Sequence, residues 1–391
     1  MTNIPRSIDE VDAAWLSDIL GSEVTSFNIK FLEGGVLADA FKVHDLTYKD
    51  ASSVAPTSLV LKLANGIAER REFAVMTRAY IKEVRFFERL KDQVPLRTPD
   101  LYYIADDGKE NVEFFVIAME DLQRHSLVFD QVEDPPNEAF TRKINLETAK
   151  LHAQYWEADV LKEDWLALPD GRYTFPLDEA ARTCPEHIDN YLTLWPEMFG
   201  EHPYEGFPDI AELTGLLTGP KAAGLVDHMN SLLDARPHTL THGDMRADNI
   251  FRTDPARGLS VDDSELTYID WQIIQPGPVG PEFSQAWQHS LPPEQRSKDM
   301  DFLKQYHDRL VQLQPAAAAY SYDMLIEDYR IGFLLWWMSL ITLGVANLPG
   351  FATPEGARNK KLWGTGMFKM KHALVDHDCL DLVKKYTAEI G

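Results

Sequence analysis

The sequence Leu240-Thr241-His242-Gly243-Asp244-Met245-Arg246-Ala247-Asp248-Asn249-Ile250-Phe251 has apolar residues at both ends and a run of polar residues between them. This pattern predicts a loop held between two short strands. A second run, Leu266-Thr267-Tyr268-Ile269, leads into Asp270. Asp244 and Asn249 stand five positions apart, and Asp270 follows the second run. The sequence thus predicts three oxygen-bearing side chains next to strand ends, in a fixed order.

This order matches the chemistry of phosphoryl transfer from ATP. That reaction needs one carboxylate to orient and deprotonate the accepting hydroxyl, and two oxygen ligands that hold Mg²⁺ against the phosphates. Protein kinases take these groups from an aspartate, an asparagine five residues later and an aspartate after a β-hairpin. A His-Gly-Asp tripeptide alone is usually only a turn, so the spacing and the apolar flanks carry the interpretation. They predict Asp244 as the base and Asn249 and Asp270 as magnesium ligands.

The stretch resembles the HGDxxxxN catalytic loop of the aminoglycoside phosphotransferase and choline kinase superfamily. It is most similar to the ecdysteroid kinase-like phosphotransferases, in which the magnesium aspartate is typically followed by Trp-Gln, as in Ile269-Asp270-Trp271-Gln272. The resemblance implies an α+β, protein-kinase-like fold of two lobes. A small antiparallel sheet would form the nucleotide-binding lobe, and a mostly helical lobe would carry the catalytic loop and the acceptor pocket.

Lys62 stands in an otherwise apolar strand pattern over residues 59–63. A lysine there is unfavourable unless its ammonium group has an anionic partner or reaches solvent at a sheet edge. The resemblance implies that Lys62 binds the ATP phosphates and is held by a helical glutamate. Glu83, in a helix predicted over residues 69–91, is the preferred partner because its surroundings are similar to the helix motif of the family. Two other glutamates of this helix compete for the role, Glu72 and Glu88.

Two further segments complete the expected nucleotide site. Gly34 and Gly35 lie between two strand patterns, where the resemblance implies a hairpin over the nucleotide phosphates. The apolar strand 114–119 ends in Glu120-Asp121-Leu122, which is similar to the junction between the lobes of the family. There the backbone at Glu120 and Leu122 would pair with the adenine edge. We therefore predict a nucleotide-binding lobe over residues 1–122 and a catalytic lobe over residues 123–391.

Composition limits the class of partner. The chain has 391 residues, enough for two lobes with separate cores, and a formal net charge of -24. This acidity argues against nucleic acid and anionic membranes, which are bound by clustered Lys and Arg. Two isolated cysteines, Cys184 and Cys379, form no disulfide framework, and the N-terminus has no secretory pattern. We expect a cytoplasmic protein.

The remaining pattern is mostly helical. A leading helix is expected to start from Ser7 as its N-cap, and helices are expected over residues 145–156, 297–314, 320–348 and 358–385. The uncharged segment Ile331–Leu348 approaches the length of a membrane span, but several small and polar residues interrupt it. We interpret it as a buried core helix rather than a membrane span.

Three further residues of the larger lobe are interpreted as structural. His152 lies in a helix similar to the L-H-A-x-x-W helix of the family and is expected to be a core histidine. Glu282 occupies the place of an aspartate that, in the family, accepts backbone hydrogen bonds and braces the catalytic loop. The Glu282 side chain is one methylene longer than that of aspartate. His242 is expected to brace the loop rather than to transfer protons.

Residues 159–212 hold thirteen acids against three bases, interleaved with aromatic residues. In the superfamily the corresponding segment builds the acceptor pocket. The acids and aromatics could therefore line a site for a cationic acceptor such as an aminoglycoside or a choline-like amine. Alternatively the acids face solvent and the aromatics line an apolar pocket for a sterol-, terpenoid- or phenol-like alcohol. We prefer the second interpretation because the whole chain is acidic.

The sequence thus predicts an ATP- and Mg²⁺-dependent O-phosphotransferase that acts on a hydroxyl of a small organic acceptor. Two other classes compete with it. A non-catalytic nucleotide-binding relative would be expected to lack the base, a metal ligand or the lysine, and all are present. A protein-substrate kinase would need a longer segment between Asp270 and Glu282 to dock a peptide.

Overall fold

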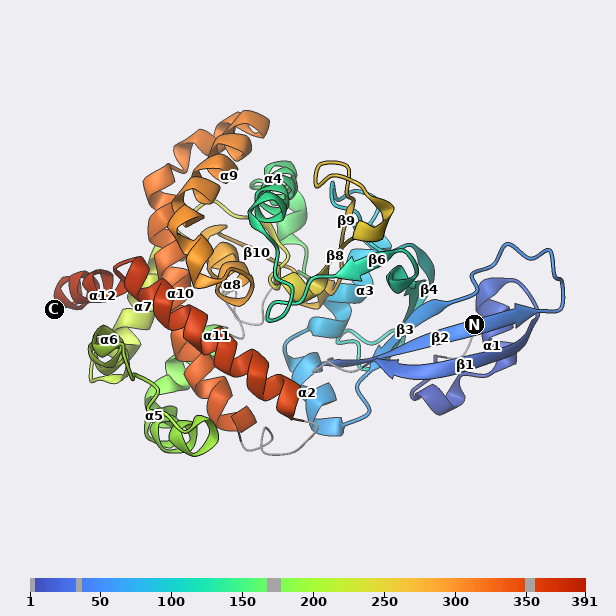
Figure 1. Cartoon of the computed structure of the whole chain (residues 1–391), viewed down its shortest axis with the longest axis horizontal. Coiled ribbons are helices and arrows are strands. Elements are labelled where there is room, and N and C mark those ends of the chain that lie inside the picture. Colours follow the sequence, from blue (N-terminus) through green and yellow to red (C-terminus); the bar gives the residue numbers. More distant parts are fainter. Residues whose placement is uncertain (1–3, 33–36, 167–176, 349–355) are drawn as a thin grey trace. The chain divides into compact units, whose positions relative to one another are not determined.

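The computed structural model describes residues 4–32, 37–166, 177–348 and 356–391 (Figure 1). The chain divides into two compact units. The first unit comprises Met1–Leu127, Glu163–Leu166 and Phe251–Ile274. The second unit comprises Val128–Lys162, Ala167–Ile250 and Gln275–Gly391. The boundary near residue 122 between the two lobes stays a prediction.

The first unit contains the predicted antiparallel sheet. Its five strands run in the order β1-β2-β3-β5-β4. They are β1 (Val24–Leu32), β2 (Ala38–Tyr48), β3 (Leu59–Ala64), β4 (Leu101–Asp106) and β5 (Phe115–Glu120). All neighbouring strands pair antiparallel, with Lys62 of β3 opposite Ala40 of β2 and Ile117 of β5. The apolar runs of the sequence therefore form one small sheet, as expected.

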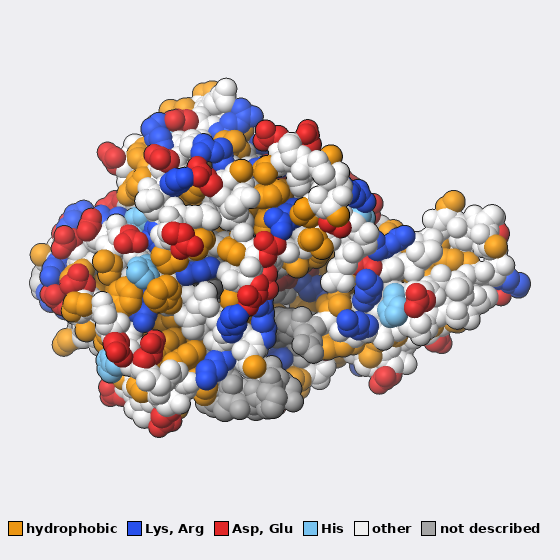
Figure 2. All heavy atoms as spheres, viewed as in Figure 1, with side chains coloured by type: hydrophobic (Ala, Val, Ile, Leu, Met, Phe, Trp, Pro, Cys, Tyr) orange, Lys and Arg blue, Asp and Glu red, His pale blue; other side chains and the backbone are white. Residues whose placement is uncertain are grey.

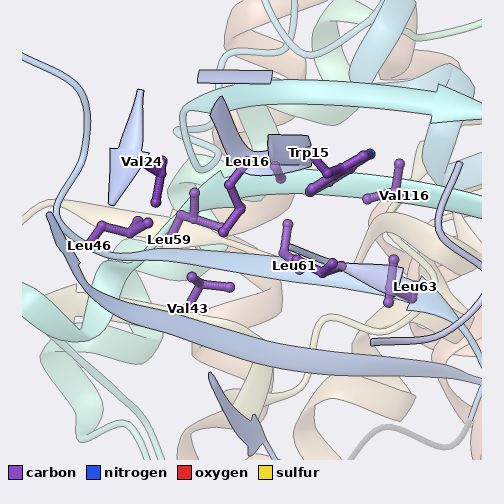
Figure 3. Close-up of a cluster of buried hydrophobic side chains, with 11 residues drawn as sticks. Trp15, Leu16, Val24, Val43, Leu46, Leu59, Leu61, Leu63 and Val116 are labelled. Atoms are coloured by element: carbon purple, nitrogen blue, oxygen red, sulfur yellow. The ribbon is translucent and has the colours of Figure 1, made fainter. Parts of the chain in front are cut away.

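Helix α1 (Ala13–Leu20) covers one face of this sheet. Its Trp15 and Leu16 pack with alternate residues of β3, including Leu59 and Leu61, in one buried cluster (Figure 3). Burying such a side chain stabilises the fold by roughly 1.5–3 kcal/mol. Because successive side chains of a strand point to opposite faces, the residues of β3 in this cluster leave Lys62 on the other face.

The start of α1 differs from our prediction. Ser7 precedes only a short 3-10 turn at Ile8–Glu10 and makes no side-chain cap. Asp12 caps α1 instead, because its carboxylate accepts a hydrogen bond from the Trp15 N–H at 2.7 Å. Asp12 was the better candidate, since it lies directly before the helical residues and its carboxylate can satisfy an unpaired N–H of the first turn.

Two long helices predicted from the pattern are each broken into two. The helix expected over residues 69–91 is α2 (Ala68–Met76) followed by α3 (Ala79–Arg89). The helix expected over residues 358–385 is α11 (Ala357–Asp376) followed by α12 (Cys379–Glu389).

Both breaks have the same local cause. Arg78 (φ 60°) and Asp378 (φ 50°) adopt the left-handed conformation at the two junctions. Neither junction contains the glycine or proline that usually signals such a break.

The second unit is mostly helical. Besides α11 and α12 it contains α4 (Glu138–Gln154), α5 (Leu177–Phe199), α6 (Pro208–Thr218), α7 (Ala222–Asp234), α8 (Gly280–Ser290), α9 (Asp299–Leu313) and α10 (Tyr322–Asn347). Two short strands, β7 (Thr239–Thr241) and β10 (Gln275–Gly277), pair antiparallel. A further three-stranded sheet has most of its residues in the first unit; its order is β6-β8-β9, formed by β6 (Ser126–Val128), β8 (Ile250–Thr253) and β9 (Leu266–Tyr268). The stretch containing Asp244 connects β7 to β8, which confirms the predicted loop between two strands.

Helix α10 is long and apolar enough to span a membrane by length and composition alone. Two observations favour a core helix instead. The helix packs against α5 and α8, and 67% of its most apolar window is buried within the protein. At Gly332 an added Cβ would lie 2.1 Å from the Ser284 hydroxyl oxygen, so the glycine permits the close approach of α8. The glycine that interrupts the apolar run therefore serves helix packing.

One buried charge of the first unit makes its stability depend on pH. Lys82 on α3 is 2% exposed, and within the described residues its ammonium group makes no hydrogen bond or ion pair. Burial, together with the charge of Arg78, lowers the pKa of Lys82 to about 7. In the unfolded chain the lysine pKa is about 10.4. Between these values the unfolded state binds more protons, so stability rises with pH.

We predict that Lys82→Met removes this dependence. Relative to the variant, the wild-type free energy of unfolding should rise by up to about 1.4 kcal/mol per pH unit between pH 7 and 9. Urea denaturation of both proteins at pH 6, 7, 8 and 9 measures the difference. Parallel profiles across this range would show that the ammonium group is not buried as described.

Candidate active site

In the first unit a buried lysine joins two carboxylates. The Nζ of Lys62 lies 2.7 Å from Glu83 Oε1 and 2.6 Å from Asp270 Oδ1. The Glu83 side chain is 1% exposed and that of Lys62 12%. Strand β3 carries the lysine, α3 carries the glutamate, and Asp270 comes 208 positions after Lys62 in the chain. Three separate segments thus meet at one ammonium group.

Glu83 is the glutamate that contacts Lys62. Of the two competitors, Glu88 pairs with Arg85, and Glu72 is exposed. Glu88 stands five positions after Glu83 and therefore lies on another face of α3, whereas Glu72 lies on the separate helix α2.

Burial and charge act in opposite directions in this cluster. Burial disfavours the ammonium form of Lys62, but the charges of Asp270 and Glu83 outweigh it and hold the lysine pKa above its usual value. Burial raises the pKa of Glu83 to about 7, against the opposing effect of Lys62. Lys62 therefore remains a cation at neutral pH, which is the form that binds phosphate oxygens.

The conformation of Asp270 is fixed by its neighbours. Its φ of 67° is left-handed, which is unusual for a residue with a side chain. The Trp271 ring stacks on Phe86 of α3 with centroids 4.0 Å apart, and the Gln272 amide donates to Asp270 Oδ2 at 3.2 Å. Phe86 stands three residues after Glu83, so both face the same side of α3. Trp271 and Gln272 thus hold Asp270 beside α3, the helix whose Glu83 contacts Lys62.

Arg97 anchors the strand that leads to Asp270. Its guanidinium donates to the Thr267 hydroxyl at 2.7 Å and to Glu120 Oε2 at 3.0 Å. Its backbone carbonyl accepts from the Tyr268 N–H at 2.9 Å. Sequence analysis missed Arg97, because no motif marks it and its partners lie far away in the chain.

The residues expected to contact adenine lie at the end of β5. The Glu120 N–H donates to the Asp100 carbonyl at 2.9 Å, and the carbonyl of buried Leu122 accepts from the His125 N–H at 3.1 Å. An adenine contact by this backbone stays a prediction. Gly34 and Gly35 lie outside the described residues.

In the second unit the Asp244 carboxylate is held by two amide donors and by an ion pair with a guanidinium. The Gln285 amide donates to Oδ1 at 3.0 Å, and the Asn249 amide donates to Oδ2 at 3.0 Å. The Arg246 Nε lies 3.3 Å from Oδ2. The nitrogen end of Asn249 is also bonded to the Asp244 carbonyl at 2.9 Å. The amide oxygen is thus the end of Asn249 whose chemistry suits a magnesium ion.

Glu282 braces the catalytic loop. Its Oε1 accepts from the Gly243 N–H at 3.0 Å, and its Oε2 accepts from His152 Nε2 at 2.7 Å. His152 Nδ1 in turn lies 2.7 Å from the Tyr306 hydroxyl. Burial opposes the carboxylate form, but His152, His242 and the Gly243 N–H outweigh it and lower the pKa of Glu282. The longer side chain therefore makes the backbone bond that the family obtains from aspartate.

The two histidines act as expected. His152 is fully buried and bonded at both ring nitrogens. His242 is fully buried, and its Nδ1 accepts from the Asp244 N–H at 3.3 Å. Neither is placed to exchange protons with solvent.

Sequence analysis also missed Gln285 and Arg246 as partners of Asp244. Gln285 could have been found, because it stands three residues after Glu282 and a helix starting near Gly280 places both on one face. Arg246 could be seen in the motif, but its spacing alone does not show that its side chain turns to the aspartate. Within the described part of the chain, no group of three His, Cys, Asp or Glu residues could by itself hold a metal ion.

Comparisons with known proteins agree with this geometry. A model of the ecdysteroid kinase-like family matches residues 37–317. Plasmodium vivax ethanolamine kinase is 14% identical over 89% of this chain and 82% of its own, with a TM-score of 0.50. The GDP and kanamycin complex of APH(2")-IIia is 13% identical over 97% of this chain and 99% of its own, with a TM-score of 0.50. Choline kinase from Cryptosporidium parvum Iowa II is 12% identical over 98% and 97%, with a TM-score of 0.47.

A comparison with curated proteins finds no significant match. At these identities the solved structures establish the fold alone. They confirm the predicted kinase-like fold, and the family match confirms the resemblance noted in the sequence.

We predict that Glu282→Asp destabilises the second unit. The shorter side chain cannot reach both His152 and the Gly243 N–H, so one buried donor loses its partner at a cost of about 1–3 kcal/mol. Urea denaturation measures this change in the free energy of unfolding. Glu186→Asp is the matched control, because Glu186 is exposed on α5 and the same shortening should have little effect there. Equal unfolding midpoints for wild type and Glu282→Asp would contradict the brace.

Proposed function

Because the chain belongs to the ecdysteroid kinase-like family, we propose that it is an ATP- and Mg²⁺-dependent kinase of a small organic alcohol. The observation that carries the proposal is the buried contact of Lys62 with both Glu83 and Asp270. A lysine shielded from water and held as a cation suits the phosphates of a nucleotide. Packing alone would favour an apolar residue at this position.

Asp244 is the proposed base. It accepts the proton of the acceptor hydroxyl as the hydroxyl oxygen forms a bond to the γ-phosphorus. The bond between that phosphorus and the β,γ-bridging oxygen breaks, and ADP leaves with the electron pair. Gln285, Asn249 and Arg246 keep the carboxylate in one orientation before the acceptor arrives. This preorganisation lowers the entropic part of the barrier.

The metal would be held by the Asn249 amide oxygen and the Asp270 carboxylate, together with the phosphates. When bound, Mg²⁺ neutralises charge that develops on the phosphoryl oxygens. Lys62 supplies a second positive charge to the phosphates, and Glu83 keeps the lysine in place.

A neutral, lipophilic acceptor is the preferred substrate class, of sterol, terpenoid or phenol type. Seven acids between Glu186 and Glu212 are all exposed to solvent, as expected for a solvated surface. The Arg246 guanidinium beside Asp244 would also repel a cationic acceptor from the base. The alternative is a cationic acceptor, such as the kanamycin bound by APH(2")-IIia.

Part of the aromatic set in this segment is used in helix packing. Tyr191 and Trp195 of α5 are buried, and Trp195 stacks on Phe199 with centroids 4.1 Å apart. These rings are therefore less suited to line an open pocket than the sequence pattern suggested.

Surface charge supports a small-molecule substrate rather than a nucleic acid, and the two free cysteines support the proposed cytoplasmic location. On the face drawn in Figure 2, Lys and Arg are interspersed with Asp and Glu, which suits a small-molecule substrate better than a nucleic acid. Cys184 and Cys379 are buried free thiols, which suits the reducing cytoplasm. A non-catalytic relative is disfavoured because Lys62, Asp244, Asn249 and Asp270 are all present.

We predict that Asp244→Asn abolishes turnover while leaving nucleotide binding intact. Loss of a general base should lower kcat by about 10²–10⁴-fold. ATP-dependent thermal stabilisation in the presence of Mg²⁺ should persist, because the phosphate-binding lysine is untouched. Asp248→Asn is the matched control from the same loop, since asparagine can still accept the Gln131 N–H that Asp248 Oδ1 accepts. Undiminished turnover in Asp244→Asn would reject the base.

The acceptor class is tested with a panel of hydroxylated compounds. We expect ATP consumption with neutral lipophilic alcohols and none with choline-like or aminoglycoside amines. Asp244→Asn serves as the blank for contaminating ATPases. Turnover confined to the cationic compounds would replace the preferred class by the alternative.

A further inference from the structure

A small cavity is lined in part by the catalytic loop, and all of its lining residues belong to the second unit. Its wall combines residues of α4, the catalytic loop and α8. The polar residues of the wall are Thr141, Asn145, Thr148, Glu282 and Ser290. Its volume is about 20 Å³, which admits one water molecule but no larger ligand.

Asn145 is the unusual residue of this wall. It is 2% exposed, and within the described part of the chain neither its amide nitrogen nor its amide oxygen has a hydrogen-bond partner. Rotating the amide by half a turn would exchange two unpartnered atoms and satisfy neither. A buried amide without partners strongly disfavours the folded state, and native proteins almost always satisfy such groups with protein or water.

The other polar groups of the wall already have partners. The Thr141 and Thr148 hydroxyls donate to carbonyls of their own helix region, Asn137 and Ile144. The Ser290 hydroxyl oxygen accepts from the Ala247 N–H at 2.8 Å. Each of these oxygens still has a lone pair that could accept a hydrogen bond from a water molecule. A water in the cavity would therefore find Asn145 as donor and acceptor and further acceptors around it.

The position of Asn145 on α4 connects it to the loop brace. His152 follows seven residues later, two turns along the same face of the helix. His152 reaches the catalytic loop through Glu282. Asn145 faces the same loop at the cavity, where Met245 and Ala247 line the wall.

We propose that Asn145 holds one buried water molecule that links α4 to Ser290 of α8 and, through Ser290, to the catalytic loop. The water satisfies the Asn145 amide and hydrogen-bonds to the Ser290 hydroxyl, which accepts from the Ala247 N–H of the loop. It forms a second brace, parallel to the His152–Glu282 brace. Asn145 is thus a positioning residue for Asp244, and this kinetic role rests on the proposed kinase function.

The water itself is tested without any assay of activity. A crystal structure of the full chain at high resolution should show an isolated density peak within about 3 Å of the Asn145 amide. An empty cavity, or one closed by neighbouring side chains, would overturn the proposal.

Variants test what the water does. Asn145→Leu keeps the branching and the number of side-chain heavy atoms but cannot bind water, so we expect kcat to fall about 3- to 10-fold with an unchanged KM for ATP. Its thermal stability should not rise. Thr148→Val is the matched control on the same wall, because that hydroxyl is already bonded within the helix, and kcat should stay within about twofold.

Two outcomes of the variants contradict the proposal. A higher melting temperature for Asn145→Leu would mean that the wild-type amide is unsatisfied in a dry cavity. An unchanged kcat despite loss of the water would remove the positioning role. If Asn145→Leu fails to fold, Asn145→Ala takes its place, because alanine also removes the amide and leaves space rather than strain. If the wild-type protein fails to consume ATP, the proposed kinase activity is refuted. The crystal structure would still show whether a water molecule is bound at Asn145.

Discussion

The burial of the Lys62 ammonium is the constraint on which the first unit depends. Removing a charge from water costs several kcal/mol, and only close opposite charges offset that cost. Glu83 and Asp270 supply them from a helix and from a segment 208 positions away in the chain. The strand, the helix and the distant segment must therefore fold together. The same requirement sets the positions of the groups that would act on a nucleotide.

The second unit uses a comparable device at its catalytic loop. Glu282 is buried and charged, and its two oxygens bond to a histidine and to a backbone N–H of the loop. Breaking such a network leaves an uncompensated buried charge, so the loop has one favoured conformation. In both units a buried carboxylate gives geometric definition that apolar packing alone would not give. The desolvation cost of each buried carboxylate is offset by the hydrogen bonds and ion pairs that hold its neighbours in one place.

The sequence predicted the parts of this structure that chemistry restricts to few residue types. The sheet, the loop between β7 and β8, the Lys62–Glu83 pair and the brace by Glu282 followed from periodicity, spacing and resemblance. The breaks at Arg78 and Asp378 did not, because left-handed backbone is uncommon for residues with a side chain and no glycine marks these positions. Arg97 and Gln285 were missed for another reason, since their roles depend on partners brought close only by the fold.

The net charge of the whole chain differs from the charge balance around the candidate site. The chain carries a formal charge of -24, yet the carboxylates at the candidate site have cationic or hydrogen-bonding partners of their own. Lys62 pairs with Glu83 and Asp270, while Asp244 pairs with Arg246 and accepts hydrogen bonds from two side-chain amides. The excess acidity therefore lies elsewhere, including the exposed acids of residues 186–212. Composition argues against nucleic acid and anionic membranes as partners, but a choice between neutral and cationic acceptors depends on the few charges within reach of Asp244. Of these, the described structure places a guanidinium closest to the base.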